Sequence, residues 1–331
     1  MANAGARVGP HVNRWYGAGL RGIAPHVDAA RAEARAAGVE IGAVAFFPSG
    51  PRNLRANDGF RSPAELAATR AYLGASGLAV LAHAAYVAQP WSTGARGAAA
   101  VRHEAELCEA AGIGLLAVHL PRDGGEESRR TVWRVFPDLL TRAMRAPGGA
   151  RTGGGGGGTG GEAAGTRLAL EIEADRPVGG RPPPLATPEG LAELFAGLPQ
   201  GGAAPWVVVD TAHLASSGAC LRTYAEADDW LRRAEHVAPL GGRIAFHLND
   251  LDAACGSGID RHAPLFRGSI WRGVPPLESG AAAVLDCAAR LGAPVILERH
   301  SRAELALDYA ALAALLPPAQ AAADVRAEPR A

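Results

Sequence analysis

The sequence contains no lysine, so all 33 of its strongly basic side chains are arginines. This absence excludes catalysis through a lysine Schiff base and a phosphate-binding loop of the usual Gly-Lys-Ser/Thr kind. Cysteine is also scarce, and its four residues show no paired spacing. That pattern predicts neither a disulfide framework nor a cysteine-based zinc site, and it favours a reducing intracellular compartment (the cytoplasm or nucleoid, or a nucleus).

Long hydrophobic runs are missing as well. No apolar stretch approaches the roughly 20 residues that a membrane-spanning helix needs, and the first residues do not form an apolar signal segment. The formal net charge is +0, so bulk charge predicts neither nucleic acid nor a membrane as a partner. We expect no membrane association and a monomer.

Short apolar runs alternate with helical patterns along most of the chain. Because parallel strands need long crossover connections, this alternation predicts a parallel sheet. Eight such units fit a single-domain α/β fold, a closed (β/α)8 TIM barrel over residues 1–316. An open doubly wound sheet is the alternative, although no glycine-rich dinucleotide turn follows the first run. The predicted strands are Arg7–Val12, Ile41–Phe47, Leu78–His83, Gly114–His119, Arg167–Glu171, Trp206–Asp210, Arg243–His247 and Pro294–Glu298.

Two segments of low complexity interrupt or follow this pattern. Residues 147–165 contain the glycine run Gly153–Gly158, which predicts a flexible loop insert. Residues 317–331 read as a disordered C-terminal tail. Neither segment carries a recognisable site.

Histidines and carboxylates stand where the predicted strands end. In a parallel barrel the carboxyl ends of all strands meet at one face, where active sites are built. Imidazole and carboxylate are ligands that zinc and manganese accept. Nine such residues exceed the three or four that one zinc takes, and three metals sharing bridging carboxylates would account for the number. Clustered metals polarise a phosphodiester and supply hydroxide near neutral pH. The nine are His83, His119, Glu171, Asp210, His213, His247, Asp260, His262 and Glu298.

The stretch His247–His262 concentrates this signal. It carries one pair, His247 and Asp250, and a second pair, Asp260 and His262, on either side of a Gly-Ser-Gly turn. Two such pairs could serve two adjacent metals, whereas a polar loop with one core histidine is the alternative interpretation.

From about Val8 to Ser301 the sequence resembles the endonuclease IV family of apurinic/apyrimidinic endonucleases. The specific signatures are Asp-Thr-Ala-His at 210–213 and His-Leu-Asn-Asp followed by Asp-Arg-His at 247–262. Weaker ones are Val-Gly-Pro-His-Val at 8–12, Ala-His-Ala-Ala-Tyr at 82–86, Val-His-Leu-Pro at 118–121, Leu-Ala-Leu-Glu at 168–171 and Pro-Val-Ile-Leu-Glu at 294–298.

The resemblance implies a TIM barrel with three zinc ions, with manganese possible at one position. His83, His119 and Glu171 would hold the first ion. Glu171 would bridge to a second, completed by Asp210, His247 and Glu298, and His213, Asp260 and His262 would hold the third.

The implied activity is zinc-dependent base excision repair. The enzyme would hydrolyse the phosphodiester 5′ to an abasic site in duplex DNA, leaving a 3′-hydroxyl and a 5′ deoxyribose phosphate. Glu171 and Glu298 would be catalytic, with Glu298 orienting or deprotonating the attacking water. Arg52, Tyr86 and Val87 match the positions that penetrate the duplex in the family.

Several positions depart from the family pattern and keep alternatives open. Leu54 replaces the usual aromatic, Asn13–Tyr16 replaces a small, glycine-rich loop, and Phe266 and Trp271 replace glycines. After Glu171 the chain reads Ile-Glu-Ala-Asp-Arg instead of a run like Asn-Thr-Ala-Gly. A xylose isomerase-like sugar isomerase or epimerase would need one metal, for which Glu171, Asp210, His247 and Glu298 suffice. A non-catalytic DNA-binding relative is the third interpretation.

Overall fold

The computed structural model describes residues 5–12, 22–122, 126–143, 165–199, 204–237 and 242–316. All but the last residue of the predicted insert 147–165 lie outside these ranges, as do the tail 317–331 and Asn13–Tyr16. Within the described chain, parallel strands form an 8-stranded sheet in the order β1-β10-β7-β6-β5-β4-β3-β2. The strands are β1 (Arg7–Pro10), β2 (Ala43–Phe46), β3 (Ala79–His83), β4 (Leu115–His119), β5 (Arg167–Glu171), β6 (Trp206–Asp210), β7 (Ile244–His247) and β10 (Pro294–Leu297).

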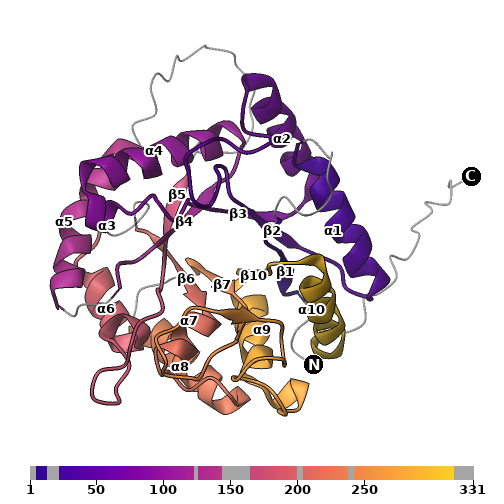
Figure 1. Ribbon diagram of the computed structural model, residues 1–331, viewed down its shortest axis with the longest axis vertical. Coiled ribbons are helices and arrows are strands. Elements are labelled where there is room, and N and C mark those ends of the chain that lie inside the picture. Colours follow the sequence, from indigo (N-terminus) through magenta and orange to yellow (C-terminus); the bar gives the residue numbers. More distant parts are fainter. Residues whose placement is uncertain are drawn as a thin grey trace, which may run out of the picture.

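The two edges of this sheet meet, which closes the barrel. The backbone N–H of Val12 donates to the carbonyl of Ala45 at 2.8 Å, and that of Gly42 donates to the carbonyl of Val8 at the same distance. Figure 1 shows the strands gathered at the centre of the molecule with the helices around them. The predicted TIM barrel is therefore confirmed, and each predicted strand coincides with an observed one.

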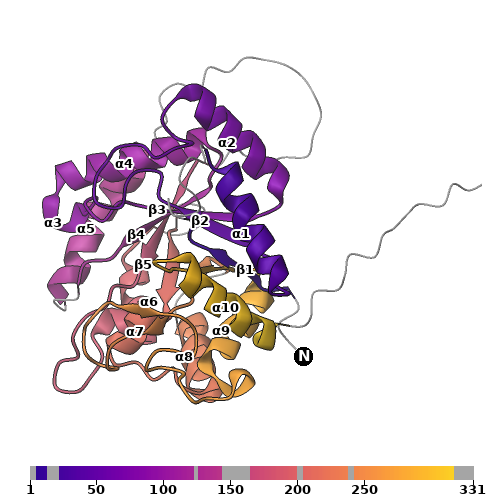
Figure 2. The same cartoon turned by 45° about the vertical axis from the view of Figure 1, so that its right-hand side comes forward.

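Helices cover the outside of the barrel, and Figure 2, turned by 45° from Figure 1, again shows them around the strands. Four of them start at a Ser or Thr whose side chain accepts a backbone N–H of the first turn: Ser62, Thr187, Ser279 and Ser301. Such caps satisfy N–H groups that have no partner within the helix. In the described ranges, no helix combines the length and apolarity that crossing a membrane requires. The helices are α1 (Ala24–Ala36), α2 (Pro63–Ser76), α3 (Pro90–Thr93), α4 (Ala95–Ala110), α5 (Glu126–Ala143), α6 (Pro188–Ala196), α7 (Thr211–Ser216), α8 (Tyr224–Val237), α9 (Gly280–Leu291) and α10 (Arg302–Leu315).

The inside of the barrel is filled by a small apolar cluster, separate from the larger core between strands and helices. Because side chains alternate between the two faces of a strand, the residue two positions further along also points inward. On six strands that next inward residue is polar, as in the steps from Leu81 to His83 and from Ala169 to Glu171. Strand register thus delivers the polar side chains to one mouth. The cluster consists of Ala43, Ala45, Leu81, Leu115, Ala117, Ala169, Val208, Ala245 and Ile296.

A short helix and a two-stranded hairpin at the mouth are absent from the sequence interpretation. The six-residue helix α7 begins directly after β6. The strands β8 (Asp250–Leu251) and β9 (His262–Ala263) pair antiparallel, with Leu251 opposite His262. The stretch predicted as a glycine-bearing loop is therefore a hairpin, which folds its far end back toward the barrel.

Candidate metal centre

Glu171 lies at the middle of the mouth and is fully buried. Its Oε2 is 3.0 Å from Nε2 of His83 and 3.3 Å from Nε2 of His119. Its other oxygen, Oε1, is 2.8 Å from Nδ1 of His247. One carboxylate from β5 therefore faces imidazoles from β3 and β4 on one side and from β7 on the other.

The nine side chains singled out from the sequence all come together at this mouth. They form overlapping groups whose possible ligand atoms lie within 4.8 Å of one another. One further residue, Glu173, joins them. The groups are His83, His119 and Glu171; Glu171, Asp210, His247 and Glu298; Asp210, His213 and His262; and Glu173, His213 and Asp260.

The Asp-Thr-Ala-His motif is positioned by a helix cap. Asp210 ends β6 and caps α7, where its Oδ1 accepts the backbone N–H of His213 at 2.9 Å. The Asp210 Oδ2 remains directed at the mouth, 3.6 Å from Nε2 of His262. A single turn of helix thus sets the aspartate and the histidine side by side, which explains their spacing of three residues.

The His-Leu-Asn-Asp motif is joined to that helix through Thr211 and Asn249. The Thr211 hydroxyl donates to the carbonyl of Asn249 at 2.7 Å and accepts its N–H at 2.9 Å. The Asn249 amide group donates to Asp210 Oδ2 at 2.6 Å and to Glu298 Oε2 at 3.3 Å. Asn249 therefore holds two carboxylates of the centre in place.

Asp250, considered from sequence as a partner of His247, has a different role. Its carboxylate accepts the backbone N–H groups of Leu251, Ile270 and Gly268 at 2.8, 2.9 and 3.0 Å. Burial raises the pKa of Asp250, against the lowering effect of these bonds. The residue braces the chain after the hairpin, and the pairing with His247 was wrong because it rested on sequence proximity alone.

The connection between β8 and β9 is fixed to the barrel through glycines. Gly258 has a positive φ of 67°, and a Cβ there would lie 2.9 Å from the backbone of Arg176. Its N–H donates to the carbonyl of Ser216 at the end of α7. This docking brings Asp260 Oδ1 to 3.3 Å from His213 Nε2 and 3.2 Å from His262 Nε2.

In three histidines, a hydrogen bond at Nδ1, the ring nitrogen directed away from the centre, fixes the orientation of the ring. Nδ1 of His83 contacts the carbonyl of Ala84 and Nδ1 of His213 that of Ile172, both at 2.7 Å. Nδ1 of His119 is 2.6 Å from Oε2 of Glu173. Each acceptor requires an Nδ1–H, so the Nε2 atom of each ring is left as a possible metal ligand.

The residues fit divalent cations. The Nε2 atoms of His83 and His119 face each other at 3.1 Å, an arrangement that is favourable only with a proton or a metal cation between them. Among the described residues, Glu171 Oε2, His213 Nε2 and His262 Nε2 are buried at the centre and make no well-aligned hydrogen bond, although each has a polar atom within 3.3 Å. Buried polar atoms without partners are costly, and coordination of cations would satisfy all three.

Electrostatics favour the charged forms of these groups in the metal-free protein. Burial would raise the pKa of Glu171, but His247, His119 and His83 outweigh it and hold the pKa well below 4.5. Burial would lower the pKa of His119, yet Glu171 and Glu173 raise it to about 10. His11 behaves differently, because burial lowers its pKa to about 4 against the opposing effect of Glu298.

The residues matched to duplex penetration lie on neighbouring loops beside the centre. Tyr86 is 46% and Val87 47% exposed, and Arg52 is exposed on the loop after β2. The Tyr86 N–H donates to the carbonyl of Pro51 at 2.8 Å, which ties the two loops together. The Tyr86 ring also lies edge-on to His83 and His119, with centroids 5.5 and 5.6 Å away.

Three residues of the mouth were missed or left open by the sequence interpretation. Glu173 and Asn249 went unassigned, and His11 lies in the mouth with Nδ1 3.6 Å from Oε1 of Glu298. Strand alternation was the available signal for Glu173, because it follows the inward-facing Glu171 by two residues.

Phe266, at a position where the family pattern has glycine, has a φ of 63°. This is the left-handed backbone conformation that favours glycine.

Comparison with known proteins agrees with this geometry. A family model described as a xylose isomerase-like TIM barrel matches residues 31–316. The chain belongs to AP endonuclease family 2. A probable AP endonuclease of African swine fever virus is 31% identical over 244 residues, which cover 70% of this chain and 71% of the viral protein.

Solved structures support the same assignment. The crystal structure of AsfvAP:AG has a TM-score of 0.73 and 27% identity, and the match covers 94% of this chain and 96% of that one. Endonuclease IV from Thermus thermophilus follows with a TM-score of 0.62, 25% identity and coverage of 92% and 98%. A D-tagatose 3-epimerase-like protein shares the fold alone, at 15% identity, a TM-score of 0.54 and coverage of 87% and 90%.

Proposed function

We propose that this protein is a metal-dependent apurinic/apyrimidinic endonuclease that hydrolyses the phosphodiester 5′ to abasic sites in duplex DNA. The supporting observation is that nine imidazoles and carboxylates converge at the mouth of a barrel of this family. They come from the carboxyl ends of six barrel strands and from two connecting segments. The sugar isomerase or epimerase alternative needs only one metal group and leaves His213, Asp260 and His262 without a role.

The proposed cofactors are three zinc ions, with manganese possible at one position. His83, His119 and Glu171 would hold one ion, and Glu171, Asp210, His247 and Glu298 a second. His213, Asp260 and His262 would hold the third, with Asp210 close enough to bridge. Bound zinc supplies Lewis acidity, which polarises the phosphodiester and makes hydroxide available near neutral pH.

Glu298 is proposed to orient or deprotonate the attacking water. Burial would raise its pKa, but His247 and His262 outweigh that effect and hold the pKa well below 4.5. The residue is therefore an ionised carboxylate near neutral pH. Its Oε2 is 3.2 Å from Nδ1 of His247, and Asn249 accepts its backbone N–H. A carboxylate held this firmly can orient an attacking water and accept its proton.

The exposed loop side chains are proposed to engage the DNA. An abasic nucleotide lacks a base, so rotating it out of the duplex costs less than rotating a paired one. Tyr86 and Val87 offer apolar surface that could fill the gap left behind. Arg52, on the adjoining loop, offers a cation for the phosphate backbone.

The direct test is incubation of the zinc-loaded protein with a duplex that carries one abasic site. We expect a single incision 5′ to the lesion, a product with a 3′-hydroxyl, and no cleavage of the same duplex with an intact base. A chelator should stop the reaction and added zinc should restore it. If protein shown to contain three zinc equivalents binds this duplex without cutting it, the endonuclease proposal is wrong and the protein is a non-catalytic DNA-binding relative.

A further inference from the structure

Glu173 is a carboxylate of the mouth that the resemblance does not account for. It lies two residues beyond the end of β5, so strand alternation turns it to the same side as Glu171. The side chain is only 14% exposed. The sequence departs from the family pattern in this run, where Ile-Glu-Ala-Asp-Arg stands in place of residues like Asn-Thr-Ala-Gly. The resemblance therefore predicts no carboxylate at this position.

Both oxygens of Glu173 are engaged in hydrogen bonds. Oε2 accepts from Nδ1 of His119 at 2.6 Å, and Oε1 accepts the backbone N–H of Ala174 at 3.1 Å. The second bond fixes the carboxylate, and the first fixes the plane of the imidazole. The opposite ring atom, His119 Nε2, lies 3.3 Å from Glu171 Oε2 at the centre.

This partner distinguishes His119 from His83 and His213, whose Nδ1 hydrogen bonds also turn Nε2 toward the centre. His83 and His213 donate from Nδ1 to backbone carbonyls, those of Ala84 and Ile172. A carboxylate carries a full negative charge, so its hydrogen bond to the imidazole is about twice as strong as a neutral one. A charged acceptor at Nδ1 also makes Nε2 a more basic ligand.

We propose that Glu173 is a positioning residue that orients His119 and strengthens its Nε2 as a metal ligand. This inference rests on the metal centre of the proposed function. Glu173 also lies within ligand range of His213 and Asp260, and each hydrogen-bonded carboxylate oxygen keeps a second lone pair. The 2.6 Å contact with His119 Nδ1 favours the positioning role, and direct coordination is the outcome that would overturn it.

The experiment compares Glu173→Ala and Glu173→Gln with the parent protein, and measures zinc affinity by competition with a chromophoric chelator. An alanine removes the acceptor, so we expect one zinc equivalent to bind about 10–100-fold more weakly. A glutamine oxygen still accepts from His119 Nδ1–H and ligates zinc poorly, so we expect Glu173→Gln to stay within about 5-fold of the parent. Free zinc in excess should restore most of the incision activity of Glu173→Ala.

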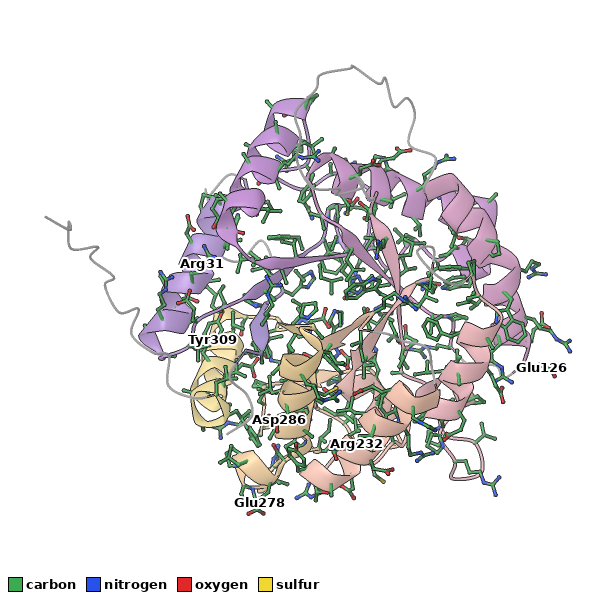
Figure 3. All side chains as sticks on the ribbon, turned by 180° about the vertical axis from the view of Figure 1, so that it is seen from behind. Arg31, Glu126, Arg232, Glu278, Asp286 and Tyr309 are labelled. Atoms are coloured by element: carbon green, nitrogen blue, oxygen red, sulfur yellow. The ribbon has the colours of Figure 1, made fainter. Side chains whose placement is uncertain are left out.

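Matched controls come from Glu278, an exposed glutamate that Figure 3 shows at the rim of the molecule. Glu278→Ala and Glu278→Gln should bind zinc as the parent does. Thermal unfolding of each metal-free variant checks that the barrel is intact. A second readout is the imidazole NMR spectrum, in which the His119 Nδ1–H proton should move upfield in Glu173→Ala and much less in Glu173→Gln.

The zinc-binding results distinguish failure of the proposed function from failure of the inference about Glu173. If the parent binds no zinc, the proposed function itself fails. If the parent binds zinc and incises but Glu173→Ala binds all equivalents equally well, the inference about Glu173 is wrong. Loss of a whole zinc equivalent in both variants would make Glu173 a direct ligand and overturn the positioning role.

Discussion

Two layers inside the barrel use the same strands for opposite purposes. The lower layer, with Leu81, Ala117 and Ala169 among its members, is buried and apolar. The upper layer begins two residues, about 7 Å, further along the strands and contains charged groups such as Glu171 and Asp210, which are equally buried. The lower layer stabilises the fold by removing apolar surface from water, whereas the upper layer places ionisable groups where burial is unfavourable.

The difference shows that burial alone does not indicate whether a residue serves stability or function. Buried carboxylates persist only when charges of opposite sign or metals surround them. In the upper layer, three imidazoles contact Glu171, two at Oε2 and one at Oε1. Substitutions in the two layers should therefore have separable effects, on activity above and on stability below.

The largest effect is expected for Glu171→Gln in the upper layer. An amide has almost the same shape but cannot replace a carboxylate that bridges two cations, so incision should be abolished while the barrel stays folded. Steady-state incision assays and circular dichroism measure the two properties. Retention of more than about one tenth of the parent activity would contradict the assignment, because loss of a central metal ligand normally costs far more.

Removal of the metals should have the next largest effect. Chelation should stop incision and lower the melting temperature, because ligands bound only by the native state stabilise it. The depressed pKa of Glu171 contributes stability that is present above pH 4.5 and is lost on acidification. The raised pKa of His119 contributes stability that is complete below pH 6.5 and is lost as the pH rises from there through about 10. Without metals the melting temperature should thus be highest between pH 4.5 and pH 6.5. A melting temperature unchanged by chelation would argue against a buried metal centre.

A substitution in the lower layer should show the reverse pattern. Leu115 is buried inside the barrel, four residues before His119 on β4. Leu115→Ala should lower the free energy of unfolding by about 2–5 kcal/mol through the cavity it leaves. Incision per folded molecule should stay close to the parent value. Chemical denaturation and an assay at low temperature test this, and a loss of activity as severe as that of Glu171→Gln would break the separation between the layers.

The smallest expected effect is a release of protons when zinc binds. In the metal-free centre the pKa of His119 is raised to about 10, and those of His213 and His247 are also raised, because nearby carboxylates outweigh burial. These rings are then protonated near pH 7 and must lose protons to coordinate a metal. Zinc titrations by calorimetry in buffers of different ionisation enthalpy should give different heats. Identical heats would mean that the rings are already neutral.

Much of this organisation is predictable from sequence because it follows from local patterns. Eight apolar runs located the strands, and the polar residue at the end of six of them located the mouth. The helix cap at Asp210 is also recognisable from the sequence, because it is a local feature. An Asp at the start of a helix accepts the backbone N–H of the residue three positions later, which here is His213. Asp250 shows where prediction from local patterns stops. It lies in the His-Leu-Asn-Asp motif, yet its carboxylate accepts the backbone N–H groups of Gly268 and Ile270. No short-range sequence pattern connects those residues to it.

The amino-acid sequence by itself determined the strand periodicity, and with it the barrel and the set of inward-facing imidazoles and acids. Only the tertiary structure decided which of these groups meet: that Glu173 contacts His119, that Asn249 joins Asp210 to Glu298, and that the β8–β9 hairpin returns His262 to the mouth. The reason is physical. Alternation along a strand is a local property, whereas these contacts depend on how separate strands and loops are aligned when the barrel closes.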